Sequence, residues 1–414
     1  MAHTIIVGGG IIGLCSAYYL RESGHAVTVI ERGDLTDGCS FGNMGYMSPS
    51  HFVPLASPGI ISEGFKYMLS SSSPFYIKPR LNLELMQWAW HFFKNSTAAH
   101  VKRSAPHLTN VLTLSRSLMN DMRAELGNSF DMEEKGCFML CKQEKTLAHE
   151  FHLADEAEKL GLKVERLNAA QVQALEPDVE LDVAGAVLFK DDCHFNPGKL
   201  MGVLKTYLEA SGVKFKLNSV VTGFERSGNL VKAVICNSEK YECDNLVIAT
   251  GSWIPAVCKM LGIHLLLQPG KGYSYTYDHV EKNIQYPAIL VDGRCAITPW
   301  GHKLRIGGTM ELSGINNKVL LKRMQGIYTS AKVFYPGLEI DFPPADKIWN
   351  GLRPVTPDGL PYIGRTKEYN NVVVAGGHAM LGISQGTGTG LLVSQLLSSS
   401  ETEIDISAFN LTRF

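Results

Sequence analysis

The chain has 414 residues, 45% hydrophobic and 19% charged, so it is long enough to bury a large core and to divide into two domains. Lys and Arg total 39 against 40 for Asp and Glu, and this net charge of -1 excludes a protein that recruits nucleic acid through a global positive field. Nine scattered cysteines form no Cys-x-x-Cys pair, so we expect reduced thiols, a cytoplasmic location and no metal site.

The first segment, residues 3–32, has the order strand, glycine turn, helix, strand and acid. Residues 4–7 form an apolar, β-branched run that leads directly into a Gly-x-Gly-x-x-Gly pattern. In this pattern Gly8 permits a tight turn, Gly10 lets the backbone approach a pyrophosphate, and Gly13 lets the helix pack against the strand. The glycine pattern could also be a purely structural turn without a ligand, but the full order of strand, glycines, helix, strand and acid favours a nucleotide site.

A helix over 14–23 and a strand over 26–30 follow these glycines, and the strand ends at Glu31. The helix N-terminus supplies oriented N–H donors for an anion, and an acid at this distance accepts hydrogen bonds from an adenosine ribose. We therefore predict a bound dinucleotide. Because glycines interrupt this apolar stretch, we expect it to be neither a signal peptide nor a membrane span. We expect no membrane span elsewhere, because no other stretch has about eighteen uninterrupted apolar residues.

The next part of the chain predicts a loop and then irregular helices. Residues 39–51 are rich in Gly, Ser and Asn and lie close to the nucleotide site in sequence. Residues 52–128 predict helices that are interrupted by Ser-Ser-Ser-Ser-Pro at 70–74. The aromatic amphipathic segment 83–93 could form a lid or a membrane-contacting face, but we expect it to pack in the core.

Alternating strands and helices follow. We predict a strand over 136–140 and helices over 144–160 and 198–210, and residues 213–234 predict a β-meander. His194 follows two acids, as at a metal corner. We prefer a helix-capping turn there, because no second group of ligands is near in sequence.

The chain then returns to the nucleotide domain. A buried strand over 245–251 ends in Ala-Thr-Gly, where backbone can again approach a ligand. Alternating strands over 270–311 predict a second, largely antiparallel domain. The strand 371–375 enters a glycine cluster over 376–388 that opens a helix over 389–397, which is the pattern of an anion or cofactor cradle.

In this order the stretches resemble the glycine oxidase and D-amino acid dehydrogenase branch of the D-amino acid oxidase superfamily of flavoproteins. The resemblance rests on the opening glycines with their acid, the loop 40–45, Ala-Thr-Gly-Ser-Trp at 249–253, Gly-Leu-Arg-Pro at 351–354, the run 356–364, and Gly-His with Leu-Gly in 377–382. It covers essentially the whole chain and implies FAD rather than NAD. The FAD is expected to be non-covalent, because no cysteine lies where sarcosine oxidases carry their flavin-linked one.

The resemblance implies an α/β fold. It combines an FAD-binding, Rossmann-like domain of the glutathione-reductase type with a second, mostly antiparallel β plus α substrate domain. We expect a discontinuous FAD-binding domain over residues 1–50, 140–225, 240–262 and 345–414. The substrate domain, with its helical insertion, is expected over 51–139 and 263–344.

The resemblance also implies site residues. Arg353 matches the arginine that holds the substrate carboxylate, and a planar guanidinium pairs bidentately with such a group; a structural arginine is the alternative. His51, Tyr273 and His378 are further candidates in the pocket, and either histidine could take a proton from an ammonium. The implied cofactor contacts are Gly8, Gly10, Ile11, Ile12, Gly13, Glu31, Arg32, Ser40, Asn43, Met44, Gly45, Val220, Thr250, Gly251, Trp253, Gly377, His378, Ala379, Met380, Leu381 and Gly382. Ala379 stands where the family commonly has glycine.

The implied reaction is oxidative deamination of an amino acid, foremost a D-amino acid. The α-hydrogen moves as hydride to flavin N5, and hydrolysis of the imino acid gives a 2-oxo acid and ammonia. The helical insertion resembles the dehydrogenase branch, so we expect electrons to pass to a quinone or other acceptor and the protein to contact the inner face of a membrane peripherally.

Other functions stay open at this stage. The nearest alternative is an oxidase or dehydrogenase of glycine or of secondary amino acids such as D-proline, hydroxyproline or sarcosine. A non-catalytic flavin-binding protein belongs to another class. An NAD(P)H-dependent reductase would need a second complete nucleotide motif, which the glycines at 386–390 do not supply. The sequence leaves the oligomeric state open.

Overall fold

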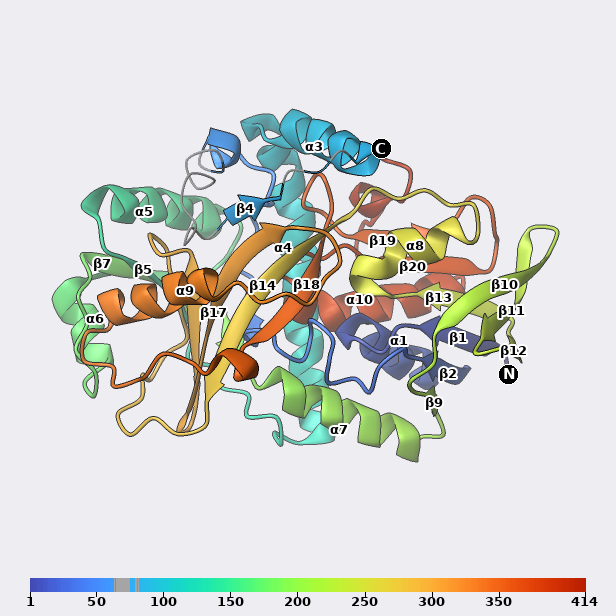
Figure 1. The fold of residues 1–414 in the computed structure, drawn as a ribbon, viewed down its shortest axis with the longest axis horizontal. Helices are drawn as coiled ribbons and strands as arrows, with labels where there is room; N and C mark the ends of the chain where they lie inside the picture. Colours follow the sequence, from blue (N-terminus) through green and yellow to red (C-terminus); the bar gives the residue numbers. More distant parts are fainter. Residues whose placement is uncertain (63, 65–74, 79, 81) are drawn as a thin grey trace.

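The computed structural model describes residues 1–62, 64, 75–78, 80 and 82–414 (Figure 1). The interruption predicted at 70–74 lies outside the described residues. The described strands form a six-stranded sheet, a nine-stranded sheet and two small sheets. This mixture of parallel and antiparallel sheets with helices confirms the predicted α/β class.

The six-stranded sheet is the predicted nucleotide-binding sheet. Four of its strand pairs are parallel, and β19 alone joins antiparallel, to β20. The opening and returning strands lie side by side, because Ile5 is in register with Leu246. The strand order is β19 (Tyr362–Arg365), β20 (Val372–Gly376), β13 (Asn245–Ile248), β1 (His3–Val7), β2 (Ala26–Ile30) and β9 (Lys214–Lys216).

The expected β-meander over 213–234 is wrong at its start. Strand β9 pairs with β2 and so becomes the edge of the parallel sheet. The strands after it, β10 (Val221–Ser227), β11 (Leu230–Cys236) and β12 (Glu239–Glu242), form a separate antiparallel sheet.

Helices α1 (Ile11–Glu22) and α10 (Gly382–Leu397) pack side by side on this sheet, as Figure 1 shows. A Cβ on Gly390 would lie 2.5 Å from the backbone carbon of Cys15, and one on Gly388 would lie 2.5 Å from the Ser115 hydroxyl. These glycines therefore let α10 approach α1 and α4 (Ala98–Leu126) closely. The predicted cradle over 376–388 is wrong in its second half, because the helix begins at Gly382 rather than at 389 and uses its own glycines for packing.

The nine-stranded sheet is mostly antiparallel and belongs to the second domain. Its order is β18 (Trp349–Val355), β14 (Gln268–Tyr277), β17 (Lys303–Leu312), β16 (Cys295–Trp300), β15 (Ala288–Leu290), β5 (Cys137–Cys141), β7 (Gly185–Phe189) and β6 (Val164–Asn168), with β4 (Phe75–Ile77) beside β17. Its core includes Phe138, Tyr273 and Phe334, the last from α9 (Leu321–Phe334).

Strand pairing corrects the expected domain division. Residues 140–189 were expected in the FAD-binding domain, but β5 pairs with β15, and β6 and β7 extend the same sheet. The apolar side chains of these strands, such as Leu140 and Leu188, join the core of the second sheet. We propose that residues 137–189 belong to the substrate domain, while β18 contributes Arg353 to the second sheet although it lies in the C-terminal part of the chain.

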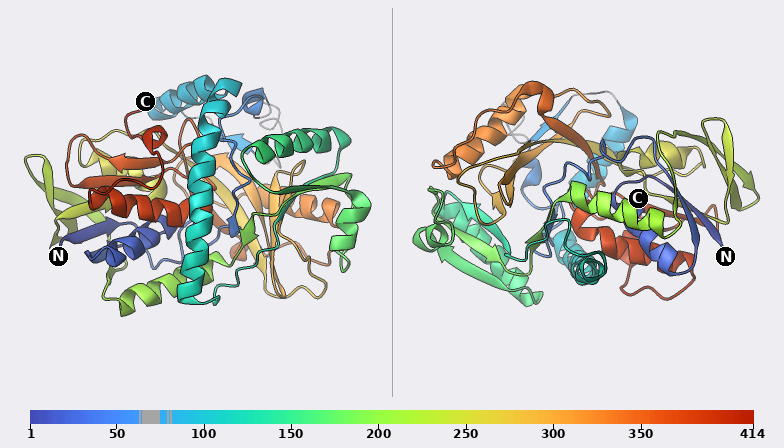
Figure 2. Two further views of the ribbon diagram at one scale, coloured as in Figure 1. Left: turned by 180° about the vertical axis from the view of Figure 1, so that it is seen from behind. Right: turned by 90° about the horizontal axis from the view of Figure 1, so that it is seen from below.

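The remaining helices cover or join the two sheets. The left view of Figure 2 shows α4 running from the top to the bottom of the molecule, between the parallel sheet on one side and the second sheet on the other. The helices are α3 (Leu83–Asn95), α4 (Ala98–Leu126), α5 (Glu144–Lys159), α6 (Ala169–Leu175), α7 (Pro197–Ala210) and α8 (Ile254–Lys259), with short 3-10 turns at Gly251–Trp253, Ala345–Lys347 and Ser407–Phe409. His194 lies in β8 (Cys193–His194), which pairs with β3 (Tyr46–Met47). Within the described residues no cluster of His, Cys, Asp and Glu could hold a metal ion.

Candidate cofactor and substrate site

A cavity of about 1050 Å³ is lined by the carboxyl ends of the parallel strands and by the nine-stranded sheet. Open α/β sheets bind ligands at this edge. Most of the predicted site residues line the cavity, from both ends of the chain. They are Gly8, Gly10, Ile11, Ile12, Glu31, Arg32, Ser40, Asn43, Met44, His51, Val220, Thr250, Gly251, Trp253, Tyr273, Arg353, His378, Ala379, Met380, Leu381 and Gly382.

The opening glycines have distinct surroundings. Gly8 has φ +108°, and a Cβ there would lie 2.4 Å from the carbonyl oxygen of Ala249, so the turn needs glycine. A Cβ on Gly13 would lie 1.9 Å from the Gly8 carbonyl oxygen, inside the fold rather than at the cavity. A Cβ on Gly10 would meet only the Ser40 hydroxyl, at 3.4 Å. Backbone at Gly10 is therefore open to a ligand, as the sequence pattern predicts.

The N-terminus of α1 faces this opening without an acidic residue in its first turn. The Ile11 N–H donates to the Ser40 hydroxyl at 3.1 Å. Glu31 accepts from the Gly9 N–H at 2.6 Å and the Gly33 N–H at 2.9 Å, which fixes the carboxylate at the cavity wall. Because no acidic side chain lies in the first turn of α1, the partial positive charge of this helix N-terminus can bind a diphosphate. The fixed Glu31 carboxylate can accept hydrogen bonds from a ribose.

Two buried hydroxyls at the cavity indicate a missing polar partner. Thr250 Oγ1 and Ser48 Oγ are buried without a hydrogen bond to any described residue, and both residues line the cavity. Buried polar atoms in folded proteins nearly always have a partner. Among the predicted cofactor contacts, the Arg32 guanidinium lies 3.6 Å from the centre of the Trp253 ring, and both residues line the cavity. These features fit FAD.

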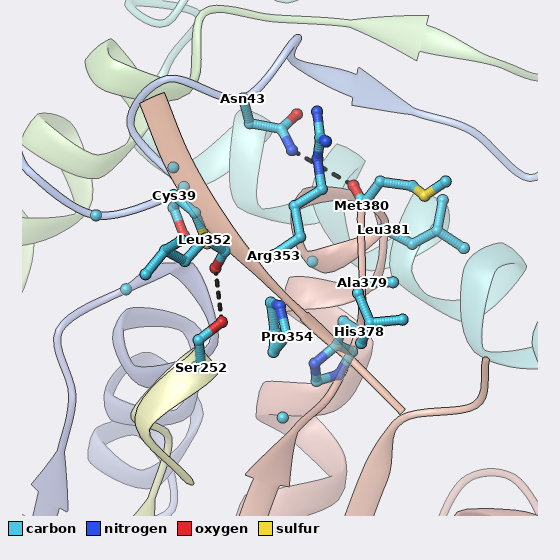
Figure 3. A pocket seen from close by; sticks show the side chains of 18 of the residues that line it. Cys39, Asn43, Ser252, Leu352, Arg353, Pro354, His378, Ala379, Met380 and Leu381 are labelled. Atoms are coloured by element: carbon cyan, nitrogen blue, oxygen red, sulfur yellow. Dashed lines mark hydrogen bonds between the residues drawn. The ribbon is translucent and has the colours of Figure 1, made fainter. Parts of the chain in front are cut away.

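The loop after β2 is held from the second domain. Thr298 Oγ1 donates to the Met44 carbonyl at 2.8 Å, and the Arg305 guanidinium donates to the Asn43 carbonyl. Asn43 Nδ2 in turn donates to the Met380 carbonyl at 3.4 Å, so loop and closing turn meet at the cavity (Figure 3). Gly45 does not line the cavity. Its φ of +81° and its contact with Phe195 make it a turn residue.

The closing turn joins β20 to α10. Gly377 has φ +81° and packs on Thr356, away from the cavity. Ala379 has φ +47°, a conformation that an alanine adopts at a cost. The first residues of α10 line the cavity, and no side chain caps that helix N-terminus. This second N-terminus, like that of α1, offers N–H donors to a bound anion.

Arg353 projects from β18 into the cavity, toward Asn43 and Met380 in Figure 3. Its Nη1 donates to the carbonyl of Thr309, and no Asp or Glu among the described residues forms an ion pair with it. Burial lowers the pKa of the guanidinium, and the nearby Cys39 thiol acts in the opposite direction. A desolvated cation without a carboxylate partner stabilises a bound anion strongly.

The three other catalytic candidates have different surroundings. Tyr273 donates its hydroxyl to Glu311 at 2.6 Å, so its phenol is already engaged. His51 lines the cavity, and its Nδ1 is 3.0 Å from the Ser50 hydroxyl; burial lowers the pKa of His51 to about 4. The His378 ring is buried, with Nε2 3.0 Å from Thr389 Oγ1, and burial lowers its pKa to about 3. Both histidines are therefore neutral at pH 7.

Some cavity residues were not predicted. Thr309, whose carbonyl holds Arg353, has φ +69°, which no sequence pattern announces. Ser252 donates to the Leu352 carbonyl at 2.9 Å and so fixes the strand that carries Arg353 (Figure 3). Ser252 lies in the run Ala-Thr-Gly-Ser-Trp at 249–253, so the resemblance to the family could have identified it. Cys39 and Ser48 lie in the loop 39–51, which the sequence analysis placed next to the nucleotide site without assigning these two residues a role.

The family described as FAD dependent oxidoreductase (DAO) matches residues 3–396 of the chain. The chain belongs to this family. This FAD-dependent oxidoreductase is 31% identical over 410 residues to a D-amino acid dehydrogenase of Helicobacter pylori, covering 98% of each chain. It is 32% identical over 424 residues to a D-amino acid dehydrogenase of Methylobacterium radiotolerans, covering 100% of this chain and 99% of that one.

Solved structures share the fold of this FAD-dependent oxidoreductase. Glycine oxidase from Geobacillus kaustophilus superposes with a TM-score of 0.80 and 23% identity, covering 100% of both chains. L-proline dehydrogenase from P. horikoshii gives 0.78 and 18% identity, covering 100% of this chain and 97% of that one. The predicted superfamily and the FAD cofactor are confirmed. Among the described helices, none combines the length and apolar character that crossing a bilayer requires.

Proposed function

We propose that the protein is a dehydrogenase that oxidatively deaminates a small amino acid, foremost a D-amino acid, to a 2-oxo acid and ammonia. The observation that carries this proposal is the Arg353 guanidinium, which lies in the FAD cavity without a carboxylate partner among the described residues. A planar guanidinium binds a carboxylate through two parallel hydrogen bonds. The names of the full-length relatives support the D-amino acid substrate.

Arg353 would bind and orient the substrate carboxylate. The Thr309 carbonyl fixes one guanidinium nitrogen, and Gly272 supplies the flat backbone on which the guanidinium packs. Bound FAD supplies the acceptor for the hydride that leaves Cα. Because hydride transfer needs a narrow approach geometry, holding the carboxylate at one place contributes most of what the chain adds to the reaction.

We propose His51 as the group that receives the amine proton. Its neutral imidazole lines the cavity, and its Nδ1 lies 3.0 Å from Ser50 Oγ. Ser50 Oγ donates to Asp192 Oδ2 at 2.6 Å, and burial raises the pKa of Asp192 to about 7. A proton taken by His51 could pass through Ser50 to this carboxyl, which titrates near neutral pH. For His378 we propose no proton transfer, because its ring hydrogen bonds inside the fold.

The acceptor side is also part of the proposal. We propose that electrons leave to a quinone or another lipophilic acceptor rather than to oxygen, with peripheral contact to a membrane. Part of the cavity wall is apolar, with Phe75, Ile77, Trp88, Met310 and Leu312 on one side. Such a wall suits a hydrocarbon ring system better than a charged carrier.

An anaerobic bleaching screen tests the function. The holoprotein is mixed with D-alanine, D-proline, cis-4-hydroxy-D-proline, glycine or sarcosine, and flavin absorbance is followed. We expect D-amino acids to bleach it fastest, and turnover with an artificial dye to exceed turnover with oxygen. A yellow protein that none of these compounds bleaches would refute the proposal and favour a non-catalytic flavin protein.

Arg353→Ala and Arg353→Lys test whether Arg353 binds the substrate carboxylate. We expect the alanine variant to keep its FAD and to lose about 3 kcal/mol of transition-state stabilisation, measured as kcat/KM. Lysine should recover only a small part, because an ammonium cannot pair bidentately. Unchanged kcat/KM in both variants would contradict a role for Arg353 in carboxylate binding.

A further inference from the structure

Helix α3 closes one side of the FAD cavity with its inner face. Leu85 and Trp88 are buried, and Trp88 Nε1 donates to the Val355 carbonyl at 2.9 Å. Trp88 and Phe92 stack with their ring centres 4.9 Å apart, and both line the cavity. The predicted core packing of this segment is therefore correct for its inner face.

The opposite face of α3 is apolar as well, and it is exposed. Leu83 is 71% exposed, Met86 61%, Trp90 56% and Phe93 58%. These four residues, the outer stripe, are spaced by three and four positions and so share one side of the helix. Figure 1 shows α3 at the outer edge of the molecule, away from the parallel sheet. Contiguous exposed apolar side chains such as these four mark interaction surfaces.

The segment that carries the outer stripe is rich in positive charge. Residues 75–103 contain five basic residues and one acidic residue, Glu84, although the whole chain is balanced. Four of the basic side chains are exposed and form the basic rim: Lys78, Lys94, Lys102 and Arg103.

Two observations tie the basic rim to the outer stripe. The ammonium of Lys94 lies 4.8 Å from the centre of the Trp90 ring. Lys94 and Arg103 also line a polar recess of about 530 Å³ between α3 and α4. In that recess Asp358 is already paired with Arg413 at 2.6 Å, so it does not neutralise the basic rim. An exposed apolar stripe with basic side chains on the same helix and on the next one matches the interface of an anionic bilayer.

The same helix connects this surface with the cavity. Phe93 of the outer stripe also lines the cavity, next to Ala89 and Phe92. The apolar cavity wall and the outer stripe are thus two sides of one helix. A lipophilic acceptor dissolved in a bilayer would therefore reach the protein at α3, the helix that also forms part of the apolar wall of the FAD cavity.

We propose that α3 docks on the surface of an anionic lipid bilayer. The outer stripe enters the boundary between headgroups and acyl chains, and the basic rim contacts lipid phosphates. This inference deepens the proposed function, since the bilayer would supply the lipophilic acceptor. Its test measures binding to lipid and is independent of turnover.

The test is co-sedimentation of the full-length holoprotein with vesicles of phosphatidylcholine mixed with phosphatidylglycerol, and with vesicles of phosphatidylcholine alone. We expect binding to the anionic vesicles that weakens as salt rises. The double variant Met86→Ser with Trp90→Ser should bind at least about tenfold more weakly. The matched control, Leu321→Ser with Val333→Ser, removes apolar side chains of similar exposure, 46% and 43%, from α9 and should bind like the parent.

A second variant, Lys94→Glu with Lys102→Glu, should lose the preference for anionic vesicles. Dye-linked activity should be unchanged in the Met86 and Trp90 variant, which shows that the fold is intact. Equal sedimentation of parent, variant and control would overturn the proposal. A lipid-free dimer that the Met86 and Trp90 variant abolishes would also overturn it, because a second copy would then cover the outer stripe.

Discussion

Gly272 provides a test of how Arg353 is positioned. A Cβ at residue 272 would lie 2.3 Å from Nη1 of Arg353 and 2.4 Å from its Cζ and Nη2. Ordinary contact between such atoms needs about 3.5 Å, so Gly272→Ala pushes the guanidinium back by roughly 1 Å. The three atoms belong to the end of a flexible side chain. We therefore expect the fold to persist while the carboxylate-binding geometry changes.

A displacement of about 1 Å in a positioning group costs roughly a hundredfold in rate, or about 3 kcal/mol. We predict this loss in kcat/KM of Gly272→Ala for amino acids with a free carboxylate, measured by anaerobic stopped-flow reduction of the flavin. FAD content should match the parent, and Tm should change by less than about 2 °C.

Gly202→Ala is the matched control. Gly202 lies in α7, and a Cβ there would meet nothing within 4 Å. The control should react like the parent. The reasoning is refuted if Gly272→Ala reduces its flavin at the parent rate. It is also refuted if the variant loses equal activity toward an amine without a carboxylate, since the damage would then not concern the guanidinium.

Two more predictions concern Asp192 and Ala379. Burial raises the pKa of Asp192 to about 7, so folding favours its protonated form, and the penalty for ionising it grows as pH rises from about 4 to 7. The stability of Asp192→Asn relative to the parent should therefore increase by about 2 to 3 kcal/mol as pH rises from 5 to 8. Urea unfolding at several pH values measures this difference, and a difference that does not change with pH would contradict the prediction. Ala379→Gly, at φ +47°, should raise the free energy of unfolding by about 0.5 kcal/mol, whereas Ala375→Gly in β20 should lower it.

Sequence alone determined the nucleotide half of the site. The turn at Gly8, the open backbone at Gly10 and the packing role of Gly13 follow from local sterics and element order, and the geometry agrees with each. Arg353 was found through its matched run, and it does line the cavity. The glycine roles are encoded by a few neighbouring residues, whereas the role expected of Arg353 came from the resemblance to a known family.

Only the tertiary structure decided which distant segments meet. The sheet to which β5, β6 and β7 belong depends on the pairing of β5 with β15, more than a hundred residues away in the chain. The glycines of α10 serve helix packing against Cys15 and Ser115, which local pattern cannot separate from a cofactor cradle. The contact of Arg353 with Thr309, the contact of Ser50 with Asp192, and the two-sided character of α3 likewise arise from contacts between remote segments. Local sequence fixes backbone preference, whereas long-range packing determines which side chains share a cavity.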